Sequence, residues 1–352
     1  MTDEPVLIRV ENGVGRLTLN RPHALHALTT QMCRMMSDAL AQWVDDPAVR
    51  LLMIDHADGT RGFCAGGDIR MVAQSGRSDG RAGQDFFAVE YRLNTQIKHF
   101  PKPYLAILDG VTMGGGVGIS IHGSHRVATE HTVFAMPETG IGLFPDVGGG
   151  WFLPRLEGEL GTWLALTGAR LKGMDVLAAG IATHFVPSDR ISELKHRVLA
   201  GEDPDAILDY LSQPPVPPNW CDHLDAINHC FDKESVTNIC AALTATGDDW
   251  AVAQVDILRT RSPMSMAVTL AQLRKGRAIA AFDDVMRMEY RIACHIIRTN
   301  DFSEGVRAVI EDKDNAPKWS PATISGVTPV MVERMFQPVE PELDLSFQGV
   351  LL

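Results

Sequence analysis

The sequence lacks the cysteine spacing, the long apolar segment and the excess of basic charge that would assign it to several common classes of protein. Its six cysteines are scattered, with no CxxC pair and no dense disulfide framework. No apolar run reaches about 18 residues without charges or glycine clusters, so nothing predicts a membrane-spanning helix. Because 44 acidic residues outnumber 32 basic ones, binding to nucleic acid or to an anionic membrane is not expected. A polyanionic small ligand remains compatible with this net charge, because it needs only a few local cations.

The compartment is inferred from the same features. Residues 1–5 carry acidic side chains where a signal or transit peptide would carry Arg or Lys. Scattered cysteines are typical of reduced thiols, so we expect a cytoplasmic protein. A length of 352 residues at about 150 residues per domain predicts about two domains.

The first part of the chain alternates strands with helices. Two alternating apolar runs flank Asn12-Gly13 and predict a β-hairpin. Thr29 or Thr30 can cap a helix that ends before Pro47. A strand, a glycine cluster and a helix then recur, around residues 51–68, 104–116 and 132–150. This recurrence predicts an α/β fold in which successive turns of the chain stack as layers.

The second part of the chain is predicted to be mostly helical. Residues 214–218 are predicted to form a linker or rigid turn, and Ser262-Pro263 is predicted to start a long helix. We therefore expect two regions, a layered α/β core at 1–200 and a mostly helical region at 201–352. Residues 311–314 (EDKD) are expected to form an exposed charged stretch with no other role.

Several common glycine, serine and histidine motifs are absent. There is no GxxxxGK[ST] phosphate loop, and residues 114–119 lack the final glycine of GxGxxG. Residues 118–122 fail the last position of GxSxG, so a serine-hydrolase elbow is not supported. His122 and His125 have no acidic or cysteine partner at ligand spacing, which favours structural roles over a metal site.

Two glycine turns, at Gly67 and Gly115, offer one chemical use. A glycine turn that opens a helix exposes backbone N–H groups and lets a ligand approach the main chain. If both turns aim an N–H at one carbonyl oxygen, they form an oxyanion hole. The other explanation is close packing of helices on strands, which is the commoner reason for glycine.

Two carboxylates follow in the third turn of the pattern. Glu138 comes directly after a proline, and Asp146 lies in a proline- and glycine-rich segment. Both are predicted in loops among apolar neighbours, where partial desolvation would raise their pKa toward values useful in acid–base catalysis. The alternative is a solvated surface pair or a helix cap.

The motifs together resemble those of the crotonase (enoyl-CoA hydratase/isomerase) superfamily. Within it they resemble the 3-hydroxyisobutyryl-CoA hydrolase branch most closely, and the likeness covers nearly the whole chain, with residues 204–256 least distinctive. The segments that carry the resemblance are residues 63–69 (FCAGGDI), 102–103 (KP) ahead of 109–110 (DG), 112–118 (TMGGGVG), 134–139 (FAMPET), 141–150 (IGLFPDVGGG), 152–156 (FLPRL), 304–309 (EGVRAV), 312–314 (DKD) and 317–319 (PKW).

The resemblance implies a fold, a site and a substrate class. The fold would be a crotonase-like spiral of stacked strand-strand-helix turns, with Gly67 and Gly115 as the oxyanion-hole positions for an acyl-CoA thioester. In the hydrolase branch, Glu138 corresponds to the principal catalytic carboxylate and Asp146 to an assisting one. Glu90 falls on an acidic substrate-binding position, and Gly115, Glu138 and Asp146 would also contact the substrate.

The implied activity is hydrolysis of a short β-hydroxyacyl-CoA, most specifically 3-hydroxyisobutyryl-CoA from valine breakdown, to the free acid and CoA. No metal or redox cofactor is expected, and CoA is part of the substrate. An enoyl-CoA hydratase or isomerase is the main alternative, although the first of the two hydratase glutamates would fall on Gly118. A non-catalytic acyl-CoA-binding protein is the alternative from another class. The helical C-terminal region is also suited to forming a homo-oligomer interface.

Overall fold

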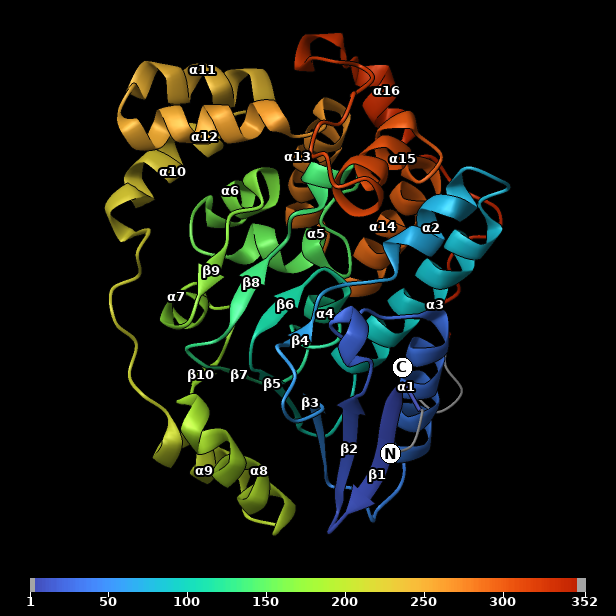
Figure 1. Cartoon of the computed structure of the whole chain (residues 1–352), viewed down its shortest axis with the longest axis vertical. Helices are drawn as coiled ribbons and strands as arrows, with labels where there is room; N and C mark the ends of the chain where they lie inside the picture. Colours follow the sequence, from blue (N-terminus) through green and yellow to red (C-terminus); the bar gives the residue numbers. More distant parts are fainter. Residues whose placement is uncertain (1–3, 347–352) are drawn as a thin grey trace.

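Figure 1 shows the computed structural model of the chain, which describes residues 4–346. Its strands form a six-stranded sheet in the order β1-β2-β3-β5-β7-β10 and a four-stranded sheet in the order β4-β6-β8-β9. Only the β1–β2 and β8–β9 pairs are antiparallel within these sheets. The strands are β1 (Val6–Glu11), β2 (Val14–Leu19), β3 (Leu51–His56), β4 (Gly62–Cys64), β5 (Tyr104–Leu108), β6 (Val111–Met113), β7 (His125–Ala128), β8 (Val133–Ala135), β9 (Leu171–Lys172) and β10 (His184–Phe185).

Three successive turns of the chain each add one strand to each sheet. The strand pairs β3 and β4, β5 and β6, and β7 and β8 follow one another in sequence, and each lies parallel beside its counterpart in the next turn. This is the predicted α/β spiral of stacked turns. The short strand β6, between β5 and the Gly114 turn, was missing from the sequence-based prediction, because three residues are too few for a clear alternation.

Local chemistry explains how the chain enters this spiral. Asn12 and Gly13, at φ +49° and +82°, connect β1 and β2 as predicted, since a tight hairpin turn needs residues that tolerate positive φ. The Thr29 side chain accepts a hydrogen bond from the backbone N–H of Met32 and caps helix α1 (Thr30–Trp43).

The remaining helices lie around the two sheets and form most of the chain after residue 190 (Figure 1). They are α2 (Ile69–Gly76), α3 (Arg81–Lys98), α4 (Gly115–Gly118), α5 (Gly149–Phe152), α6 (Leu160–Thr167), α7 (Met174–Ala178), α8 (Ile191–Leu199), α9 (Pro204–Leu211), α10 (Leu224–Phe231), α11 (Val236–Thr246), α12 (Asp249–Thr260), α13 (Pro263–Ala278), α14 (Phe282–Ile296), α15 (Asn300–Val306) and α16 (Pro329–Arg334).

The C-terminal region is helical, as expected. The Ser262 side chain accepts a hydrogen bond from Ser265 N–H, and Pro263 occupies the first position of α13. Pro214–Pro218 forms an extended connection between α9 and the helices that begin near residue 221 (Figure 1). Helices α13 and α14 both pack against α5, and α14 also packs against α3. The division of the chain near residue 200 stays a prediction.

No helix within residues 4–346 combines the length and apolar character needed to cross a membrane. The six cysteines, all within the described residues, form no disulfide.

Candidate active site

All five site residues predicted from the sequence line one cavity of about 560 Å³. The cavity lies where the glycine turns after β4 and β6 meet the segment after β8 and the middle of α3. Positions separated by up to 79 residues are thus brought together by the stacking of consecutive turns. The five residues are Gly67, Glu90, Gly115, Glu138 and Asp146.

The two glycine turns lie against each other. A Cβ atom added at Gly115 would lie 3.3 Å from the backbone nitrogen of Gly67 and 2.5 Å from Glu90 Oε1. Gly115 is the first residue of α4, where a backbone N–H has no acceptor within its own helix. Gly114 reaches this turn at φ +47° and ψ −122°, a conformation that side chains disfavour. The two turns can therefore present adjacent N–H groups to one oxygen atom.

Glu138 is buried beside these amides. It opens a short 3₁₀ helix (Glu138–Ile141) after Pro137, and Gly142, at φ +73°, ends that helix. Glu138 Oε1 would lie 3.2 Å from a Cβ atom added at Gly114. Its other oxygen, Oε2, is buried and has no hydrogen-bond partner among the described residues. Burial, and secondarily the neighbouring Asp146, raise the pKa of Glu138 well above its usual value.

Asp146 is also buried, at 5% exposure, so the surface-pair alternative for these two carboxylates is wrong. Tyr91 Oη donates a 2.8 Å hydrogen bond to Asp146 Oδ2. Burial raises the pKa of Asp146 to about 7, although the Tyr91 hydrogen bond acts in the opposite direction. Tyr91 was not identified from the sequence, and its position directly after Glu90 was the only available signal.

Glu90 completes the acidic side of the cavity. It lies on α3, is 2% exposed, and its Oε1 has no hydrogen-bond partner within residues 4–346. Burial, followed by the Asp146 carboxylate, raises the pKa of Glu90 well above its usual value. A buried oxygen without a partner costs free energy, so it is ready to bond a polar group of a ligand.

The position of the missing hydratase glutamate is occupied by other side chains. A Cβ atom added at Gly118 would lie 2.6 Å from Val147 Cβ and 2.9 Å from Asn94 Nδ2. Both contacts are closer than real Cβ contacts. The chain therefore lacks the carboxylate at this position and also lacks the space for it.

A C-terminal segment that was not predicted to belong to the site also lines the cavity. Val309 and Ile310 line it, and both belong to a π-helical turn, Arg307–Glu311. Turns of this kind are frequent at functional sites.

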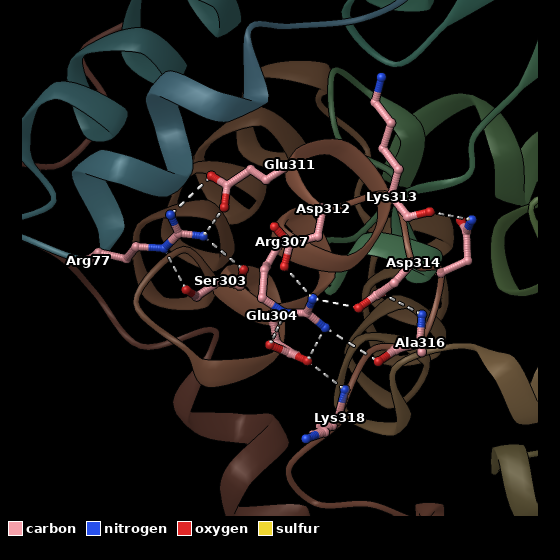
Figure 2. A network of polar contacts seen from close by, with 11 residues as sticks. Arg77, Ser303, Glu304, Arg307, Glu311, Asp312, Lys313, Asp314, Ala316 and Lys318 are labelled. Carbon is pink, nitrogen blue, oxygen red and sulfur yellow. Dashed lines mark hydrogen bonds and ion pairs between the residues drawn. The ribbon is translucent and has the colours of Figure 1, made fainter.

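Polar contacts fasten this C-terminal segment (Figure 2). Arg77 donates to both carboxylate oxygens of Glu311, at 3.0 and 3.1 Å. Arg307 donates to Asp312 and Asp314, both at 2.7 Å. Residues 311–314 are exposed, as expected, but the expectation that they have no other role is wrong. Glu311 ties the segment to Arg77, whereas Asp312 and Asp314 bond Arg307 within the segment itself.

The two histidines singled out from the sequence have other partners. His122 Nε2 bonds Val147 O at 2.8 Å, and His125 Nε2 bonds Asp205 Oδ1 at 2.8 Å. Within residues 4–346, no group of three or more His, Cys, Asp or Glu side chains is arranged to hold a metal ion.

Adjacent glycine amides beside buried carboxylates are the arrangement of an enzyme site that acts on a carbonyl group. The enoyl-CoA hydratase/isomerase family matches residues 14–336. The chain belongs to this family.

Individual proteins of known sequence or structure are similar over almost the whole chain. The "3-hydroxyisobutyryl-CoA hydrolase, mitochondrial" of Gallus gallus is 45% identical over 95% of this chain and 89% of its own length. A structure titled as a carnitinyl-CoA dehydratase from Mycobacterium thermoresistibile has a TM-score of 0.94 and 43% identity, covering 98% of this chain and 100% of its own. A structure titled as an enoyl-CoA hydratase from Rhodobacter sphaeroides has a TM-score of 0.89 and 39% identity, with the same coverage.

The expected cytoplasmic location is contradicted by these comparisons. The name of the Gallus gallus relative places that protein in mitochondria. Scattered, unpaired cysteines argue only against oxidising compartments, so they do not separate one reducing compartment from another.

Proposed function

We propose that this protein hydrolyses a short β-hydroxyacyl-CoA thioester, specifically 3-hydroxyisobutyryl-CoA, to 3-hydroxyisobutyrate and CoA. The observation that carries this function is the filled space at Gly118, where Val147 excludes a second carboxylate. Hydration of a double bond uses two glutamates in this superfamily, whereas thioester hydrolysis needs one carboxylate, a water molecule and an oxyanion hole. The 45% identity to a relative named as this hydrolase agrees with that choice.

The amides of Gly67 and Gly115 would hold the thioester oxygen. Their N–H groups would stabilise the negative charge that develops on this oxygen when the carbonyl carbon becomes tetrahedral. Losing one such donor typically costs about 100- to 1,000-fold in rate. The contact between the two turns supports this role, because one oxygen atom can then reach both groups.

Glu138 would act either as the nucleophile or as the general base for the attack on the carbonyl carbon. In one route its carboxylate bonds the carbonyl carbon, CoA leaves as the thiol after taking up a proton, and water hydrolyses the resulting anhydride. In the other route Glu138 takes a proton from a water molecule that attacks the same carbon directly, the C–S bond then breaks, and CoA leaves as the thiol with that proton. The raised pKa makes Glu138 a stronger base and nucleophile once it is ionised.

Asp146 and Glu90 would bind the acyl group and the water. Asp146 would bind the substrate hydroxyl or orient the hydrolytic water, and Tyr91 fixes its side chain for this. Glu90 Oε1, buried without a partner, would bond the same acyl portion. No metal or redox cofactor takes part in this scheme, and CoA enters only with the substrate. With this substrate the reaction would belong to valine catabolism.

The test compares two reactions of the same purified enzyme. Thiol release from 3-hydroxyisobutyryl-CoA is followed beside loss of enoyl absorbance with crotonyl-CoA, because the two solved structures carry dehydratase and hydratase titles. We expect rapid thiol release and little hydration. Hydration without thiol release would overturn the proposal in favour of a hydratase. Binding of both thioesters without turnover would make the protein an acyl-CoA-binding protein.

A further inference from the structure

The loop that carries Asp146 has a strained backbone. Val147 adopts φ +51° and the following Gly148 φ +89°. A β-branched residue in this left-handed region is a genuine outlier, and such strain persists only where the surroundings impose it. The loop therefore needs contacts that hold Asp146 in its present position.

Buried side chains supply these contacts to the backbone on both sides of Asp146. Glu289 accepts hydrogen bonds from Gly148 N–H, at 2.8 Å to Oε2, and from Gly150 N–H, at 2.7 Å to Oε1. Gln272 Nε2 donates to Pro145 O at 2.8 Å and to Glu289 Oε1 at 3.1 Å. Together Glu289 and Gln272 bracket Asp146 from residue 145 to residue 150.

Both side chains come from the C-terminal helices and are fully enclosed. Glu289 lies on α14 and Gln272 on α13, and each is 0% exposed. Neither lines the substrate cavity, so neither can touch the substrate. Contacts are tight here, since a Cβ atom added at Gly150 would lie 3.0 Å from Glu289 Oε1.

The burial of an acidic side chain at this place needs a reason. A buried carboxylate is costly unless hydrogen bonds compensate it, and all three of its donors here belong to the loop or to Gln272. In sequence, Glu289 falls on the apolar stripe of α14 formed by Phe282, Val285, Met286, Ile292, Ala293 and Ile296. An apolar residue would suit the stripe better, which makes a purely packing role a poor explanation.

We propose that Glu289, assisted by Gln272, is a positioning residue that holds the strained 145–150 loop so that Asp146 faces the thioester. This inference rests on the proposed function, because it assigns Asp146 a part in hydrolysis. The C-terminal helices then contribute to the rate through the loop, without contacting the substrate.

The test is a double-mutant cycle on the full-length enzyme with 3-hydroxyisobutyryl-CoA. Glu289→Gln keeps the shape of the side chain but replaces one accepting oxygen by an NH₂ group, so one loop N–H loses its acceptor. We expect kcat to fall by about 10- to 100-fold, as for a misplaced catalytic group, while KM changes by less than about threefold. In an Asp146→Asn background, the same substitution should cost less than about threefold more, because its effect passes through Asp146.

The matched control is Glu159→Gln. Glu159 is also buried and is bonded to Thr162, Arg274 and Arg277, but it does not contact the loop. We expect its kcat to stay within about twofold of the wild type even if its melting temperature falls. If Glu289→Gln does not fold, Gln272→Met decides the question, since it removes the donor to Pro145 O and retains similar volume.

Each result has a defined meaning. Losses that multiply in the double variant, or an unchanged kcat in the folded Glu289→Gln or Gln272→Met variant, would overturn the positioning role. Absence of thiol release from the wild-type enzyme would instead overturn the proposed function, and the two failures are therefore distinguishable.

Discussion

Carboxylates in two regions of this protein have opposite surroundings. In the cavity, burial raises the pKa values of Glu138 and Asp146, and Glu138 Oε2 has no partner within the described chain. In the C-terminal segment, hydrogen bonds from Arg307 lower the pKa values of Glu304 and Asp314. The ionised form of a carboxyl group is thus destabilised in the cavity and stabilised in the C-terminal segment.

The two environments suit two different roles: reaction with a substrate in the cavity, and attachment of the C-terminal segment at the surface. A carboxylate that lacks a cation and is cut off from water binds a proton or attacks an electrophile more readily than a solvated one. A carboxylate paired with arginine at the surface gains modest stability and a defined position. The buried, unpaired carboxylates lie where the thioester would bind. The arginine-paired carboxylates lie in the C-terminal segment that lines the same cavity.

The largest expected effect is the loss of rate on substitution of Glu138, the unpaired carboxylate in the cavity. Glu138→Gln removes the charge and keeps the shape, so thiol release should fall by roughly 100- to 10,000-fold while acyl-CoA binding, measured by calorimetry, is retained. The control from the other region is Glu311→Gln, whose partner is Arg77, and its rate should stay within about twofold. Unchanged thiol release from Glu138→Gln would contradict the role given to this residue.

An intermediate effect is expected on stability and its dependence on pH. The pKa of Asp146 rises from 3.8 to about 7 on folding, so the folded protein keeps this proton while the unfolded chain releases it. Asp146 therefore lowers the free energy of unfolding progressively as pH rises from about 4 to about 7. Asp146→Asn should be more stable than the wild type at pH 7, and the difference should vanish near pH 4.

The control for this experiment has the opposite sign. The pKa of Asp314 is lowered by Arg307, so its contribution is present at neutral pH and is lost as pH falls through that lowered value. Asp314→Asn should be slightly less stable than the wild type at pH 7. Thermal unfolding of the three proteins from pH 7 down to pH values below 3.8 checks both signs. A difference between the wild type and Asp146→Asn that does not change with pH would refute the explanation.

The smallest effect is expected at the surface contacts. Arg77→Met removes the pair with Glu311 and the hydrogen bonds to Ser303 (Figure 2) and should lower the melting temperature by less than about 2 °C. In about 1 M salt the difference should shrink, since the screening length falls to about 3 Å. Arg34→Met, which breaks an exposed pair with Asp85, is the matched control. A tenfold loss of kcat in Arg77→Met but not in Arg34→Met would show that this surface contact contributes to the rate, which would contradict the comparison.

Much of the fold could be predicted because its signals are local. The Asn12-Gly13 turn, the Thr29 cap and the Ser262-Pro263 helix start all depend on neighbouring residues. The glycine turns at Gly67 and Gly115 were visible for the same reason. What their amides face, by contrast, depends on chain segments distant in sequence.

Dependence on distant segments explains some of the errors and omissions. The acidic side chains at 311–314 read as merely exposed, because their partners Arg77 and Arg307 come from other elements or from the preceding turn. Tyr91 was missed because its hydroxyl reaches Asp146 across the fold. For Glu289, a charged residue on an apolar helical stripe was a usable signal that was overlooked.

Hydrophobic periodicity, turn residues and helix caps act over a few neighbouring positions, so the layered α/β plan, the glycine turns and the acidic residues available for chemistry could be predicted from the sequence. Three other properties depend on the folded chain: Val147 fills the space beside Gly118, Glu138 and Asp146 are removed from water, and side chains of α13 and α14 hydrogen-bond the loop that carries Asp146. Those properties arise from burial and contact between distant segments, and therefore exist only once the chain has folded.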